Sequence, residues 1–217
     1  MKTMKTRKIL SVLLSVIMLL GIVPAGVMTA SAADDVFTYD VVDGEAVIIS
    51  CEITASGDIV VPSGYNGYPV TGIDLFAFLN CSKVRNVYIP DSVKEIGNKA
   101  FSGCTLLETV TLGKGVEKLG KEVFLNCDSL KKVNVSADNA VFSSDNEGVL
   151  YNKDKTELLF YPVANDAVTY SVAEKVEKIA DSTFSMSQNV KTIILGDNVK
   201  EIGNNAFRNT IIVHSDR

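Results

Sequence analysis

The stretch IGNKAFSGCTLLETVTL, residues 96–112, contains the pattern that decides this fold. An apolar residue and a glycine precede a phenylalanine, a cysteine follows three residues later, and apolar and polar residues alternate at the end. Copies of the pattern recur every 23 residues over much of the chain. A fixed period of this length is typical of solenoids, in which each repeat buries its apolar side chains only against its neighbours.

The phenylalanines of the repeats predict a buried aromatic ladder. They are 23 residues apart, except for one gap of 60, and lie at Phe78, Phe101, Phe124, Phe184 and Phe207. Three residues after a phenylalanine the earlier copies place Cys81, Cys104 and Cys127, and the later copies place Ser187 and Thr210. Because cysteine, serine and threonine share this position, we expect a second structural ladder of small buried side chains, with free thiols.

Each repeat ends in a short predicted strand, such as Val110-Thr111-Leu112, whose apolar residues point inward. The segment 96–101 suits a tight turn with a short helical piece. Strands on one side and bulkier turns on the other would curve the solenoid, so we expect a parallel sheet on its concave side. The outward side chains of this sheet are the candidate binding residues Asn86, Tyr88, Thr109, Thr111, Lys132, Asn134, Thr192 and Ile194.

The gap of 60 residues contains a hidden repeat and an insertion. Tyr170-Ser171-Val172 and then Val176 keep the spacing that the repeats show at 110–112 and 116, which identifies the hidden strand. The extra chain, at about residues 136–167, has two apolar runs around a polar turn, which is typical of an inserted β-hairpin. We expect the hairpin at 142–161 to be a second candidate binding surface.

The two ends of the repeat region differ. Residues 33–58 contain predicted strands at 37–42 and 46–51 around Asp43-Gly44, a strong hairpin signal. We expect this N-terminal hairpin to cap a solenoid that spans residues 59–213. At the other end the approach to the last strand is cut short, which leaves a brief strand at 211–213 and a tail at 214–217.

The first 32 residues have the layout of a secretory signal peptide. Four basic residues precede an apolar run from Ile9 to Val23, and the small residues Ala30-Ser31-Ala32 suit cleavage after Ala32. A membrane anchor is the alternative, but the run is shorter than the roughly 20 residues that span a bilayer. We therefore expect a secreted or extracellular protein without a membrane span after cleavage, either released or retained non-covalently at the cell surface.

Charge and composition disfavour several classes of function. The 217 residues have a formal net charge of -5, and removal of residues 1–32, with four basic and no acidic residues, lowers it to -9. An acidic chain has no basic excess to neutralise phosphates, so we expect no nucleic-acid partner. The single histidine, His214, lies in the tail, which disfavours a catalytic triad or a multi-histidine metal site. We expect no catalytic residues, no bound metal and no cofactor.

The carboxylates give only weak signals. The run 145–148 faintly matches a calcium-binding loop, but the EF-hand spacing fails because Ser143 stands where the first aspartate belongs. A polar approach to the hairpin is the interpretation that we favour. The other acids fall mostly in turns and form no evident glycosidase pair; examples are Asp91, Glu95 and Glu201.

Two further features leave alternatives open. Tyr65, Tyr68 and Tyr88 could form an aromatic platform for a sugar, although we favour packing of the first two within their turn. Export permits disulfides, and a bridge between Cys51 and Cys81 depends on geometry that the sequence does not give.

The repeat also matches a known pattern, I-G-x-x-A-F-x-x-C-x-x-L-x-x-V-x-L, directly at Ile96–Leu112 and with close variants beginning at Ile73 and Leu119. Over roughly residues 59–213 it resembles the BspA-type leucine-rich repeats of bacterial surface proteins, and the inserted hairpin is similar to that family's. The resemblance implies a strand-dominated α/β leucine-rich-repeat solenoid in a secreted or cell-surface protein that binds proteins or other macromolecules, often at a host interface. The chain departs from the pattern at Ser187 and Thr210.

We therefore expect a secreted, non-catalytic leucine-rich-repeat protein that mediates protein–protein recognition or adhesion through its concave sheet. Its partner would be a protein or glycan ligand at the cell surface or host interface. The alternative is a carbohydrate or cell-wall binding module within a bacterial surface assembly. A hydrolase of unrecognised type is a third class, which the absence of a recognisable site disfavours.

Overall fold

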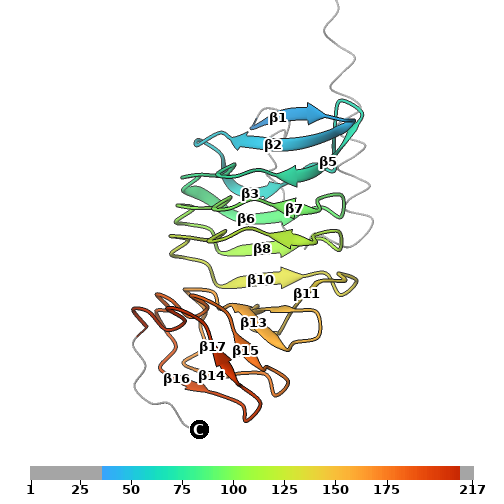
Figure 1. Ribbon diagram of the computed structural model, residues 1–217. Coiled ribbons are helices and arrows are strands. Elements are labelled where there is room, and N and C mark those ends of the chain that lie inside the picture. Colours follow the sequence, from blue (N-terminus) through green and yellow to red (C-terminus); the bar gives the residue numbers. More distant parts are fainter. Residues whose placement is uncertain (1–35, 211–217) are drawn as a thin grey trace, which may run out of the picture. The chain divides into compact units, whose positions relative to one another are not determined.

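The repeats stack as rungs whose strands pair into sheets, as Figure 1 shows for this computed structural model. The structure describes residues 36–210. The predicted signal peptide, the last predicted strand at 211–213 and the tail lie outside the described residues. All regular secondary structure within 36–210 is β-strand, so this range contains no helix that could span a membrane.

The first sheet has four parallel strands in the order β10-β8-β6-β3. Val110 lies opposite Val87 on one side and Val133 on the other, so the predicted 23-residue register is confirmed. The predicted hidden strand is also present, but it pairs in a separate two-stranded sheet in which Tyr170 lies opposite Ile193. The bounds of the strands in these two sheets are β3 (Ser56–Val60), β6 (Lys83–Ile89), β8 (Thr109–Leu112), β10 (Lys132–Val135), β14 (Thr169–Ser171) and β16 (Thr192–Ile194).

The segments for which we expected a tight turn with a short helical piece begin in a second sheet. Ile96 pairs in parallel with Ile73 and with Leu119, in strands of two residues. The residues that follow, 98–103, form turns without helix, so the predicted tight turn is present and the predicted short helical piece is wrong within the described residues. The strands of this sheet are β1 (Phe37–Val42), β2 (Glu45–Cys51), β4 (Gly64–Tyr65), β5 (Tyr68–Ile73), β7 (Glu95–Ile96) and β9 (Lys118–Leu119).

Left-handed residues on both sides of each phenylalanine explain why this segment is not helical. Two residues before Phe101, Lys99 has a φ of 54°, and two residues after it Gly103 has a φ of 77°. Each left-handed residue interrupts the run of right-handed dihedrals that a helix needs. The equivalent residues of the other rungs share this conformation: Phe76, Asn80, Glu122, Asn126, Ser182, Met186, Asn205 and Asn209.

The predicted phenylalanine ladder lies in the core of the rungs. Phe78 and Phe101 are fully buried, and their ring centroids are 4.6 Å apart. Phe124 follows at 5.9 Å from Phe101. In the last described rungs, Phe184 is fully buried and stacks at 5.3 Å on Phe207, which is half-buried.

The ladder of small side chains forms hydrogen bonds between rungs. The Sγ atom of Cys104 donates to the carbonyl oxygen of Phe78 at 3.1 Å, and Cys127 repeats the bond to Phe101 at 3.1 Å. Thr210 donates in the same way to Phe184, whereas the hydroxyl of Ser187 donates to Phe184 in its own rung at 2.8 Å. Burial raises the pKa of Cys127 to about 12, so its thiol is unreactive at neutral pH.

The inserted segment forms three antiparallel strands, β11 (Phe142–Ser144), β12 (Leu150–Asn152) and β13 (Glu157–Phe160). The last of them pairs in parallel with β15 (Lys178–Ile179), which pairs with β17 (Glu201–Ile202). The predicted hairpin is thus present as β12 and β13. Because β13 also joins the parallel stack, the inserted segment supplies a rung of its own.

The aromatic ladder continues through the inserted segment by way of two consecutive residues. The ring of Phe160 lies 5.2 Å from Phe124, and the ring of Tyr161 lies 4.8 Å from Phe184. The amide of Tyr161 donates to the carbonyl of Thr183 at 3.0 Å, the bond that Phe78, Phe101 and Phe184 form with the next rung. Tyr161 therefore occupies a phenylalanine position.

The predicted N-terminal hairpin consists of β1 and β2. Asp43 and Gly44 both have positive φ, at 54° and 81°, which is the conformation that a two-residue type I′ turn requires. β2 pairs in parallel with β5, and the ring of Phe37 lies 5.5 Å from that of Phe78. The hairpin thus extends both the second sheet and the aromatic ladder, while its role as a stabilising cap stays a prediction.

Substitution of Phe101 by alanine should lower the free energy of unfolding by about 3–5 kcal/mol, because it removes a fully buried ring between two others. Urea denaturation followed by circular dichroism measures this change. Leu106→Ala in the same repeat is the control, because Leu106 is 43% exposed. A loss below about 1 kcal/mol for Phe101→Ala would show that the ladder is not core.

The two glycines that follow predicted strands, Gly113 and Gly196, should respond differently to alanine. A Cβ at Gly113 would lie 2.6 Å from the carbonyl carbon of Pro90, whereas a Cβ at Gly196 would have no atom nearer than 3.8 Å. We expect Gly113→Ala to cost about 1–3 kcal/mol and Gly196→Ala to be close to neutral, measured by urea denaturation. Equal effects would contradict the rung spacing described here.

Candidate functional site

The predicted binding residues of the first sheet lie together on its outward face in two rows. One row contains Asn86, Thr109 and Lys132, and the next contains Tyr88, Thr111 and Asn134. Lys132 is exposed and the other five are half-buried, while the alternate residues of the same strands point into the core. The structure thus places six of the eight predicted residues on one continuous face, which we call the polar face.

Strand β3 adds Asp58 and Val60 to the polar face. Asp58 lies opposite Asn86 and accepts a hydrogen bond from its Nδ2 atom at 2.6 Å. Burial raises the pKa of Tyr88, and the negative charge of Asp58 adds to the shift. The phenol of Tyr88 therefore stays protonated at neutral pH and can donate a hydrogen bond.

The other two predicted residues, Thr192 and Ile194, are not on the polar face. They lie on β16, which pairs only with β14 among the described residues. The inserted segment causes this separation, because it occupies the free edge of β10. There the amide of Val133 donates to the carbonyl of Gly148 at 2.9 Å, which takes the place of a bond to the next parallel strand.

Lys132 connects the polar face to the inserted segment. Its Nζ atom donates to the carbonyl of Asn146 at 3.2 Å. A Cβ added to Gly148 would lie 2.6 Å from the Cβ of Lys132, so the glycine permits the close approach. The second candidate surface, at 142–161, therefore directly adjoins the first.

Asp145, in the run that faintly matched a calcium loop, has a structural role. Its carboxylate accepts hydrogen bonds from the amide of Val149 at 2.9 Å and from the hydroxyl of Tyr170 at 2.6 Å. The hydroxyl of Tyr151 forms hydrogen bonds with the carboxylate of Asp145 and with the hydroxyl of Tyr170. Burial raises the pKa of Tyr151 and of Tyr170, so both remain neutral donors. This network holds the inserted segment against β14.

The tyrosines proposed as an aromatic platform are not equivalent. Tyr65 stacks on Tyr39 with ring centroids 3.9 Å apart, so Tyr65 packs against the N-terminal hairpin. Tyr68 is 42% exposed on β5, in the second sheet, whereas Tyr88 lies on β6 in the first sheet. Tyr88 is therefore the aromatic residue of the polar face.

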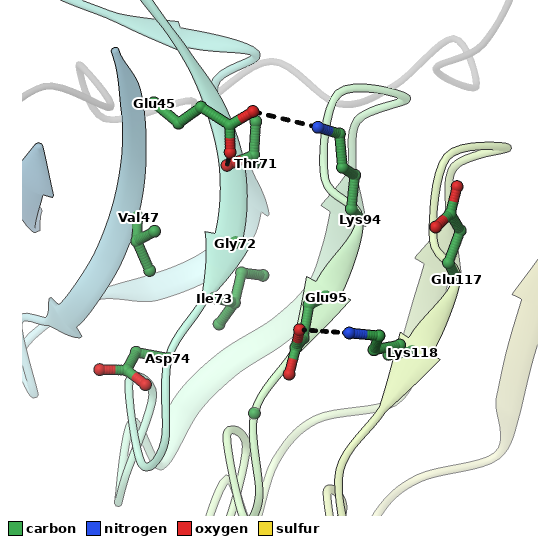
Figure 2. Close-up of a pocket in the computed structure, with 11 residues that line it drawn as sticks. Glu45, Val47, Thr71, Gly72, Ile73, Asp74, Lys94, Glu95, Glu117 and Lys118 are labelled. Carbon is green, nitrogen blue, oxygen red and sulfur yellow. Dashed lines mark hydrogen bonds and ion pairs between the residues drawn. The ribbon is translucent and has the colours of Figure 1, made fainter. Parts of the chain in front are cut away.

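The sequence interpretation missed a pocket of about 340 Å³ on the second sheet, shown in Figure 2. Ion pairs cross it between Lys94 and Glu45 at 3.1 Å and between Lys118 and Glu95 at 3.4 Å. Hydrogen bonds from Lys94 and from Thr71 lower the pKa of Glu45. Gly72 also lines the pocket, and a Cβ added there would lie 3.3 Å from the Cγ1 atom of Val47.

Charges of opposite sign alternate between rungs along the second sheet and along the parallel strands β13, β15 and β17, which together we call the second stack of strands. Glu95 and Glu201, which we expected in turns, lie instead on the short strands β7 and β17. Lys178 lies between Glu157 and Glu201, at 3.2 Å and 3.7 Å, and Lys200 pairs with Glu177 at 3.0 Å. Side chains of opposite charge 23 residues apart, such as Glu95 and Lys118, are the sequence signal that indicates these strands.

The paired charges make this second stack a weaker candidate for binding than the polar face. Exposed ion pairs contribute little to stability. Lys94, Lys118 and Lys200 nevertheless each already have an acidic partner within the chain. On the polar face, by contrast, the central side chains are neutral, and Tyr88 and Thr111 lie side by side in register. The polar face therefore offers more hydrogen-bonding groups that a ligand could use.

Comparison with known proteins gives a family and a fold. A family model described as a BspA type leucine rich repeat region matches residues 64–155 and 156–216, with six copies. None of the curated proteins matches the chain.

Two solved structures show the likeness of the fold. The pneumococcal vaccine antigen PcpA has a TM-score of 0.58 at 18% identity, over 83% of this chain and 68% of that protein. A leucine-rich repeat protein from Bacteroides ovatus has a TM-score of 0.55 at 21% identity, over 84% of this chain and 52% of that protein, so the chain spans about half its length. The match of the family model to more than half of the residues, together with the stacked rungs, shows that the chain belongs to the BspA-type leucine-rich repeat family.

Proposed function

We propose that this chain is a secreted, non-catalytic recognition protein that binds a protein ligand on its polar face, around Tyr88. The observation that carries the proposal is the in-register row of Val60, Tyr88, Thr111 and Asn134 across four parallel strands. Extended surfaces of this kind are what stacked repeats provide for binding. The residues of the N-terminal signal pattern, 1–32, support the extracellular location.

The chemistry of the polar face suits a protein partner. Tyrosine is enriched among the residues that dominate binding energy, and here it has neutral hydrogen-bonding neighbours in Asn86 and Thr111. Charges of opposite sign, Asp58 and Lys132, lie on the outer strands β3 and β10. An aromatic centre with a polar, charged rim is the usual anatomy of a protein interface.

The polar face is also rigid before a ligand arrives. Strands β6 and β8 are each hydrogen-bonded to a strand on both sides, so their outward side chains project from a fixed backbone. Asn86 is further held by its hydrogen bond to Asp58. A preorganised surface loses less conformational entropy on binding, which favours affinity.

A binding role is favoured over a catalytic one by the groups present. Besides Asp58 and Lys132, the polar face carries threonine and asparagine side chains and a tyrosine whose pKa is raised, away from the range of an active base. The only histidine of the sequence is His214, beyond the repeats that build the polar face. The carboxylate of Asp58 accepts a hydrogen bond from Asn86, and among the described residues it has no hydrogen bond with a threonine hydroxyl that it could activate as a nucleophile.

A glycan of the cell surface or cell wall is the second candidate ligand. The observation in its favour is the hydroxyl of Tyr88 among the neutral side chains of Asn86, Thr109 and Thr111, which match the hydrogen-bonding groups of sugars. Parallel screens of the purified chain against extracellular proteins and against a glycan array separate the two classes. Binding only on the glycan array would replace the protein proposal.

Once a ligand is found, Tyr88→Ala should raise its Kd by about tenfold or more, because an aromatic side chain at the centre of an interface carries much of the binding energy. Lys132→Ala should weaken binding less, since this residue lies at the rim and its amine is already engaged by Asn146. Isothermal titration calorimetry measures both effects.

The matched control for these variants is Lys118→Ala on the second sheet. Its side chain is 71% exposed, and its removal leaves the polar face intact. The proposal fails if Tyr88→Ala binds like the unmodified chain, or if Lys118→Ala weakens binding as much as Tyr88→Ala does.

A further inference from the structure

We propose that Cys51 and Cys81 form a disulfide bond that ties the N-terminal hairpin to the first repeat. In the structure all four cysteines are buried free thiols. Three of them belong to the ladder of small side chains, whereas Cys51 lies at the end of β2 in the hairpin. The inference rests on the position of Cys51 in the stack of rungs and does not depend on the proposed function.

Cys51 occupies the place that a phenylalanine takes in the other rungs. Its amide donates to the carbonyl of Ala77 at 2.6 Å. Phe78 repeats this bond to Ala100 at 2.7 Å, and Phe101 repeats it to Val123 at 3.0 Å. The ring that this rung lacks comes from Phe37, the partner of Cys51 across the hairpin.

The presence of a cysteine in this phenylalanine place brings two thiols together. Each ladder cysteine directs its sulfur at the carbonyl of the residue in the phenylalanine place one rung earlier, as Cys104 does with Phe78 at 3.1 Å. For Cys81 that residue is Cys51, whose carbonyl oxygen is 3.6 Å from the Cys81 sulfur. Cys81 is therefore the ladder cysteine whose target carries a thiol of its own.

The two sulfurs also share one neighbouring atom. The carbonyl oxygen of Glu52 is 3.8 Å from the sulfur of Cys51 and 3.7 Å from the sulfur of Cys81. The interaction between the thiols also shifts their acidities: it raises the pKa of Cys51, to which burial adds, and it lowers that of Cys81. The two thiols therefore lie in one shared buried environment.

The other pairs of cysteines are poorly placed for a bridge. Cys81, Cys104 and Cys127 occupy equivalent positions in successive rungs, so their side chains point the same way at the spacing of neighbouring strands, about 4.8 Å. A disulfide instead needs Cβ atoms about 3.8 Å apart that face each other. Cys104 and Cys127 also use their thiols in hydrogen bonds to the main chain at 3.1 Å.

The reaction is a thiol–disulfide exchange with a small disulfide oxidant such as oxidised glutathione. The thiolate of one of the two cysteines attacks one sulfur of the oxidant, breaks its S–S bond and releases one thiol as a mixed disulfide forms. The thiolate of the other cysteine then attacks the protein sulfur of the mixed disulfide and releases the second thiol. Two protein thiols are thereby oxidised to one disulfide, and the oxidant is reduced to two thiols. Since both sulfurs are buried in the folded chain, we expect the bond to form during folding.

The test is to refold the full chain, reduced and denatured, in a buffer of reduced and oxidised glutathione. Free thiols are then blocked with iodoacetamide, and non-reduced peptides are mapped by mass spectrometry. We expect two of the four thiols to be lost, with the peptide of Cys51 linked to that of Cys81. Labelling of all four thiols, or a linkage between two of the ladder cysteines, would overturn the proposal.

Serine variants provide the controls. Cys51→Ser and Cys81→Ser should each keep all of their remaining thiols free, whereas Cys104→Ser should still lose two. A second readout covers the case in which a variant folds poorly: for the unmodified chain, adding a reductant should lower the Tm by roughly 5–10 °C, because the bridge closes a loop of about 30 residues. An unchanged Tm on reduction would contradict a bridge that ties the hairpin to the first repeat.

Discussion

The stacking of each phenylalanine on the phenylalanine of the next rung is the constraint on which the rest of this structure depends. Phe78, Phe101 and Phe124 fix the spacing between rungs, and the main-chain bonds on either side fix their register. Once the register is fixed, residues 23 positions apart must lie next to each other. Side chains as different as the buried thiols, the paired surface charges and the row around Tyr88 are therefore placed by one repeated contact.

The same register produces two sides of different chemistry. On the second stack of strands, acids and bases alternate between rungs and neutralise each other within the chain, as Glu95 and Lys118 do. On the polar face, neutral hydrogen-bonding side chains surround one aromatic residue, and their groups remain available to a ligand. The inserted segment ends this face, because the carbonyl of Gly148 accepts a hydrogen bond from Val133 at the edge of β10 where another parallel strand would otherwise add. The extent of the proposed binding surface is thus set by the insertion as much as by the repeats.

Much of this arrangement could be predicted from the sequence, and the failures have physical causes. The aromatic ladder and the row of Tyr88 and Thr111 follow from the period alone. Short helices were wrongly expected because residues such as Lys99 adopt a left-handed conformation that depends on the neighbouring rungs. Tyr161 keeps the 23-residue distance to Phe184, but the pattern before it does not match, because only two residues separate it from Leu158, whereas four separate Phe101 from Ile96. The separation of Thr192 and Ile194 from the polar face depends on how the insertion pairs, which a repeat pattern does not encode.

The most direct measurement of the central claim is the affinity of a Thr111→Arg variant for the ligand. Thr111 lies half-buried at the middle of the polar face and points away from the core, so a long charged side chain there blocks the surface without disturbing the ladder. The account predicts that binding weakens by about a hundredfold or more while the urea midpoint stays unchanged. Unchanged affinity in a folded variant would contradict it, because the ligand would then bind elsewhere.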